Sequence, residues 1–100
     1  MASMASMTKH GAQRMRERNG FKAKAAERMT ERIFADGIRR ENTTGRLRKW
    51  VDHVYYKGES LPIIYGDKCY IYTNDDKNRL ITVINIPPNI MKDKKKMIRI

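Results

Sequence analysis

Cysteine and histidine are scarce in this chain, and their scarcity excludes several kinds of site. Cys69 is the only cysteine among 100 residues, so the chain cannot close an internal disulfide or hold a metal on paired thiolates. A single thiol also fits a reducing compartment. The only histidines are His10 and His53, and neither an HExxH motif nor a carboxylate cluster accompanies them. We therefore expect no metal and no other cofactor.

Long apolar runs are also missing. No run approaches the roughly 20 residues that span a bilayer, and the N-terminus lacks the apolar block of a secretory signal. We expect a cytoplasmic protein without a membrane partner. The chain is long enough for one domain with a modest core, and we find neither an internal repeat nor a glycine-rich phosphate loop.

Acidic residues are half as frequent as basic ones. Lys and Arg number 22 against 11 Asp and Glu, which gives a formal net charge of +11 and a pI near 10.1. Such an excess favours a polyanionic partner. Composition alone leaves RNA, DNA, an anionic surface and an acidic protein or nucleoprotein open as that partner.

The first half of the chain has helical periodicity. Residues 1–8 repeat Met-Ala-Ser and read as a start scar or a disordered lead-in outside the fold. Thr8 is a suitable cap for a helix over residues 9–19, which Gly20 would end. Apolar spacing predicts a second helix over 22–36 and a third over 44–58. The apolar stripe of the third comprises Leu47, Trp50, Val51, Val54 and Tyr55.

The second half has strand composition. Runs rich in Ile, Val, Tyr and Thr at residues 61–65, 68–73 and 80–86 are separated by turn residues, which predicts an antiparallel meander. Residues 89–100 form a basic tail that is either partly disordered or paired as an edge strand. The expected fold is α+β, with residues 9–88 forming one domain. In it, two to three N-terminal helices pack on one face of an antiparallel sheet of three to four strands.

The first expected helix has a distinctive stripe. His10, Arg14 and Arg18 stand at i, i+4 and i+8, so they share one helix face. Guanidinium groups hold phosphates, and an imidazole moves protons near neutral pH. A solvated basic helix face explains the stripe equally well.

Three segments carry a family resemblance: HGAQRMRERNG, YGDKCYIYT and LITVINIP. With these, residues 9–88 resemble a group of small bacterial and prophage proteins whose first helix follows a His-x-x-x-Arg-x-x-x-Arg pattern. That group is placed near the RelE-like ribonuclease-toxin fold. The helix expected over residues 44–57 departs from a minimal RelE-like chain, which turns sooner into strand.

The resemblance implies a metal-independent, toxin-like endoribonuclease acting on RNA, with an antitoxin or host protein as its partner. It singles out His10, Arg14 and Arg18. In this chain the candidates are then His10 for proton transfer, and Arg14, Arg18 and Arg79 for neutralising the phosphate charge.

Other residues are candidates for nucleic-acid binding. One group of basic residues either lines a track for phosphates or belongs to a solvated loop, and the sequence supports both interpretations equally. The group comprises Arg39, Arg40, Arg46, Arg48 and Lys49. Tyr70 and Tyr72 share a strand face and either stack a base or, as we prefer, pack in the core. Lys94, Lys95 and Lys96 would add affinity without reading sequence.

Two further functions remain open beside the ribonuclease. One is a non-catalytic phage or mobile-element protein that binds nucleic acid or a host nucleoprotein, for example an inhibitor of a defence system. The other is a structural component held to its partner by a sheet edge and the Lys-rich tail. The sequence leaves the oligomeric state open.

Overall fold

A mostly antiparallel sheet organises the molecule. The computed structural model describes residues 6–54 and 60–99. Its sheet has the strand order β1-β5-β4-β3-β2, in which only the β1–β5 pair is parallel. The strands are β1 (Ser6–Met7), β2 (Ile38–Arg39), β3 (Ser60–Tyr65), β4 (Lys68–Thr73) and β5 (Arg79–Asn85). The three long strands are the predicted meander, and the two short strands extend it at both edges.

Helices precede, interrupt and follow these strands. They are α1 (Lys9–Asn19), α2 (Ala23–Asp36), η1 (Arg40–Asn42), α3 (Gly45–Val54), α4 (Pro88–Met91) and η2 (Lys94–Met97). The first two agree with the predicted ranges, and the α+β class is confirmed. The expected continuation of the third helix to residue 58, with Tyr55 in its stripe, lies outside the described residues. Within the described part of the chain, no helix is long and apolar enough to cross a membrane.

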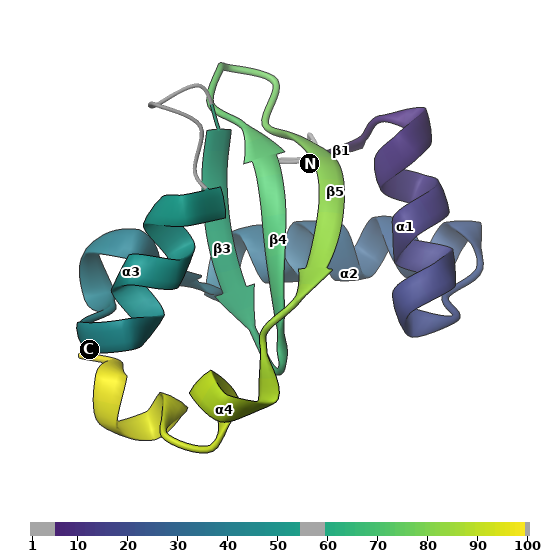
Figure 1. Ribbon diagram of the computed structural model, residues 1–100. Coiled ribbons are helices and arrows are strands. Elements are labelled where there is room, and N and C mark those ends of the chain that lie inside the picture. Colours follow the sequence, from purple (N-terminus) through teal and green to yellow (C-terminus); the bar gives the residue numbers. More distant parts are fainter. Residues whose placement is uncertain (1–5, 55–59, 100) are drawn as a thin grey trace.

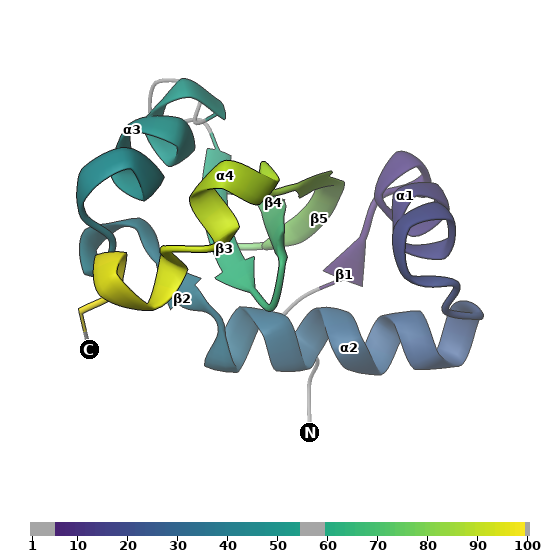
Figure 2. The same ribbon diagram turned by 60° about the horizontal axis from the view of Figure 1, so that its bottom comes forward.

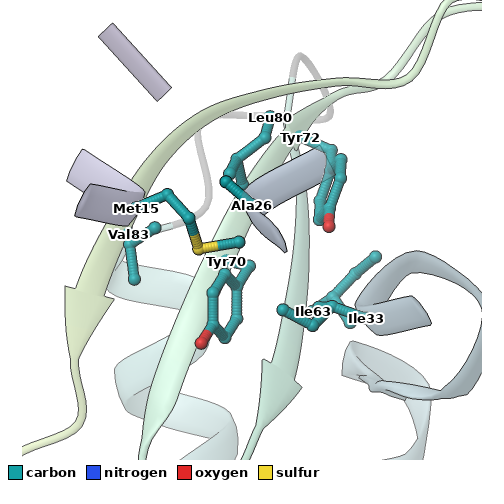
Figure 3. Packing of buried hydrophobic residues seen from close by; sticks show 8 residues of the cluster. All are labelled: Met15, Ala26, Ile33, Ile63, Tyr70, Tyr72, Leu80 and Val83. Carbon is teal, nitrogen blue, oxygen red and sulfur yellow. The ribbon is translucent and has the colours of Figure 1, made fainter. Parts of the chain in front are cut away.

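The helices cover both faces of the sheet, not one face as predicted (Figures 1 and 2). One core cluster joins α1 and α2 to the sheet and contains Met15, Ala26, Ile33, Ile63, Tyr70, Tyr72, Leu80 and Val83 (Figure 3). The second joins α3, α4 and η2 to the opposite face and contains Leu47, Val51, Ile64, Cys69, Ile71, Ile86, Ile90 and Met97. Successive residues of β3, Ile63 and Ile64, therefore enter different cores. Burial on both faces explains why these strands read as continuous apolar runs.

The start of α1 is fixed to β5. The Thr8 side chain accepts a hydrogen bond from Gly11 N, as predicted for the cap, and Thr8 N donates to the Leu80 carbonyl at 2.9 Å. Ser6 and Met7, assigned by sequence to the lead-in, form β1 beside Arg79 and Leu80. The prediction that residues 1–8 lie outside the fold is therefore wrong for Ser6 and Met7, which belong to the sheet. Residues 1–5 lie outside the described part of the chain.

The basic C-terminal segment folds back onto α3. Met97 is buried, and its carbonyl accepts a hydrogen bond from Thr44 N at 2.8 Å. Arg99 N donates to the Asn42 carbonyl at 2.7 Å, and an isolated bridge joins Thr43 to Ile98. Up to Arg99 the segment is thus neither disordered nor an edge strand of the main sheet, because its apolar residues complete the second core.

Candidate nucleic-acid interface

The positive charge is segregated along the chain. Residues 60–91, which include the meander, hold three basic and three acidic side chains. Residues 39–54 and 92–99 together hold ten basic and three acidic side chains. The fold packs these last two segments against each other, although more than 35 residues separate them in sequence.

We call the exposed cations of these two segments the C-terminal basic surface. They are Arg46, Lys49, Lys92, Lys95, Lys96 and Arg99. Contacts around η2 hold the surface together, since Arg46 Nη2 lies 2.5 Å from Asp93 Oδ2 and Met97 Sδ accepts from Leu47 N. Its cations come from two segments, so no single stretch of sequence displays it.

Three arginines of the predicted phosphate track make internal contacts. The Arg39 guanidinium lies 4.7 Å from the centre of the Phe34 ring and donates to the Phe34 carbonyl. Arg40 pairs with Asp52, and that hydrogen bond lowers the pKa of the carboxyl group. Arg48 Nη1 donates to the Thr43 carbonyl at 3.3 Å. These arginines hold the segment before α3 in place, which leaves Arg46 and Lys49 as the more exposed members of the track.

The three tail lysines also differ. Lys94 Nζ donates to the Gly66 carbonyl in the β3–β4 turn, and partial burial lowers the pKa of this ammonium group. Lys95 and Lys96 are exposed. The structure therefore gives Lys94 a docking contact and presents Lys95 and Lys96 to solvent.

The predicted catalytic stripe lies on α1, beside β5 (Figure 1). Arg14 Nε donates to His10 Nε2 at 3.3 Å, and Arg14 Nη1 lies 3.3 Å from Glu17 Oε1. Arg79 is exposed and directly precedes Leu80. Because the Leu80 carbonyl accepts a hydrogen bond from Thr8 N, just before α1, Arg79 lies near the His10 end of this helix. Arg18 is exposed two turns away.

The two strand tyrosines lie in the core (Figure 3). Tyr72 OH donates to the Thr30 carbonyl at 2.7 Å, and Tyr70 OH accepts from Asn19 Nδ2 at 3.2 Å. Burial raises the pKa of both phenols. Both rings are buried in the core, in agreement with the packing interpretation, and neither is exposed on the surface where a base could stack on it.

Two features escaped the sequence analysis. Lys24, Arg28 and Arg32 form an exposed row on α2 with the same i, i+4, i+8 spacing that drew attention to His10. Trp50, expected inside the third helix's core stripe, lies only at its margin, whereas Leu47 and Val51 are fully buried. Spacing could have revealed the first feature, but the second depends on what α3 packs against.

A cavity of about 490 Å³ lies between α1, α2 and β1. Lys9 and Arg16 line one side, while Glu27 and Glu31 line the α2 side. Two carboxylates repel phosphate, so this cavity suits a polyanion less well than the C-terminal basic surface does.

Neither metal-binding side chains in the described residues nor similarity to a known protein gives further information about the function of this surface. The described residues contain no group of three His, Cys, Asp or Glu side chains placed to bind a metal. No family model matches the chain, and no curated protein or solved structure matches it either.

Proposed function

We propose that this protein binds nucleic acid through the C-terminal basic surface. The observation that carries the proposal is the docking of residues 92–99 onto the start of α3, which joins two basic segments into one surface. The six exposed cations of this surface, in two segments that together hold ten basic and three acidic side chains, attract polyanions and release counterions when phosphates bind.

The salt dependence of binding tests this proposal. We expect the logarithm of the affinity for RNA or DNA to fall linearly with the logarithm of salt concentration. Replacing Lys95, Lys96 and Arg99 together by alanine should reduce that slope by about 2, because each phosphate contact contributes roughly 0.7 to 0.9. Fluorescence anisotropy of labelled oligonucleotides measures both slopes.

A matched variant separates this surface from net charge. Replacing Lys24, Arg28 and Arg32 on α2 also removes three exposed cations, and we expect a smaller change of slope. Equal effects of the two triple variants would assign binding to overall charge. Binding that is indifferent to salt would point to an acidic or nucleoprotein partner instead.

Toxin-like endoribonuclease activity is the second candidate. The hydrogen bond between Arg14 and His10 supports it, because it places a phosphate-binding group beside a proton-transfer group. The resemblance to RelE-like ribonucleases supports the same residues, with Arg18 and Arg79 neutralising phosphate. In this hypothesis an antitoxin or host protein controls the enzyme in the cytoplasm.

An RNA cleavage assay with chelator present tests the second candidate. We expect His10→Ala to abolish cleavage while RNA affinity stays within a few-fold of wild type. Gln13→Ala, an exposed change on the same helix, is the control. No cleavage of any RNA by the wild type would favour the non-catalytic alternative, in which a phage or mobile-element protein blocks a host nucleoprotein.

A further inference from the structure

One flank of α3 combines an aromatic ring with two polar groups. Arg46 and Trp50 are four residues apart and Trp50 and His53 are three apart, so the three side chains lie on one side of the helix. Leu47 and Val51 point into the second core, while Arg46 and His53 are exposed. Trp50 lies between these two environments.

That flank faces the C-terminal segment. Arg46 reaches Asp93 just before η2, which fixes the direction in which this side of α3 points. Trp50 packs against the second core and is only partly buried. The partly buried ring therefore lies on the same side of α3 as Arg46, a cation of the C-terminal basic surface.

We propose that Trp50 stacks on an unpaired base, so that the nucleic acid bound at the C-terminal basic surface is single-stranded. This inference rests on the proposed nucleic-acid binding and adds the class of ligand. Phosphates would lie along Lys49, Lys95 and Lys96, while a base stacks on the accessible part of the Trp50 ring. A duplex keeps its bases stacked on one another, so it supplies the charge without covering the ring.

The fluorescence of Trp50 reports this contact directly, because it is the only tryptophan of the chain. The experiment titrates the intact protein with a short oligothymidylate and with a duplex of equal phosphate number, under selective excitation of tryptophan. We expect strong quenching by the single strand and little by the duplex. Anisotropy of the labelled oligonucleotides measures binding in parallel.

Two substitutions separate stacking from packing. Trp50→Leu keeps an apolar side chain but removes the aromatic face, and it should weaken single-strand binding about tenfold. Trp50→Phe keeps a smaller ring and should retain most of the affinity. Phe21→Leu removes a partly buried ring that packs against the other core, and it should leave binding unchanged. Circular dichroism confirms that each variant is folded.

The possible outcomes are distinct. Single-strand binding without quenching, or equal quenching by the duplex, overturns the stacking inference and leaves the proposed function standing. A folded Trp50→Leu variant that binds the single strand as tightly as the wild type also overturns the stacking inference and leaves the proposed function standing. Absence of binding to both nucleic acids overturns the proposed function and this inference together.

Discussion

At the residue scale, Gly11 is the position whose identity the tertiary structure constrains most clearly. A Cβ atom built there would lie 2.0 Å from the Leu80 carbonyl oxygen and 2.8 Å from its carbon. Both atoms belong to the backbone of β5, so neither can turn aside as a side chain would. Gly11 thus allows α1 to approach the sheet edge, and it places His10 beside that edge.

Gly11→Ala tests this close approach. Helix propensity alone predicts a gain of about 1 kcal/mol for alanine, whereas overpacking costs about 1 to 3 kcal/mol. Because the clash is with backbone, we expect a net loss in the free energy of unfolding. Urea denaturation at constant slope measures it.

The control for Gly11→Ala is the exposed Gln13→Ala on the same helix, expected to change stability by about 0.5 kcal/mol or less. A more stable Gly11→Ala protein would show that α1 does not rest against Leu80.

At the element scale, the C-terminal segment shows how a few apolar residues position many charges. Met97 is buried among residues of the second core and also meets the first turn of α3. Burial of the Met97 side chain is favourable because it removes apolar surface from water, and it fixes the position of the polar residues next to Met97 in the sequence. The basic surface therefore depends on an apolar contact.

Met97→Ala should cost about 2 kcal/mol of unfolding free energy, the lower end for a buried methionine, since Met97 lies at the core's edge. Lys96→Ala, an exposed change one residue away, should cost about 0.5 kcal/mol or less. Denaturant midpoints compare the two variants. If both unfold like the wild type, the segment does not dock on α3 in solution, and the basic surface loses its structural basis.

At the scale of the whole molecule, the fold separates neutral from charged regions. The long strands lie between two helical layers (Figures 1 and 2), and the helices of the two basic segments, α3 and η2, lie together on one side of the sheet. Concentrating like charge costs electrostatic repulsion, which Asp52 and Asp93 reduce through their pairs with Arg40 and Arg46. Such an arrangement is typical of surfaces that meet a polyanion.

The sequence by itself determined the local structure. Period-3.6 spacing placed α2, Thr8 and Gly20 placed α1 by marking its ends, and β-branched runs placed the three long strands. These signals are local because backbone hydrogen bonding and side-chain alternation act over a few residues. The His10–Arg14 contact was also predictable, since it spans one helical turn.

Only the tertiary structure decided which face each helix covers and which arginines stay exposed. Arg39 and Arg46 look alike in sequence, yet one stacks on Phe34 and the other meets Asp93 on the basic surface. Ser6 and Met97 likewise carry no local signal for their places beside β5 and on α3. The physical reason is that such contacts join residues far apart in the chain, and burial of apolar area across the whole fold selects them.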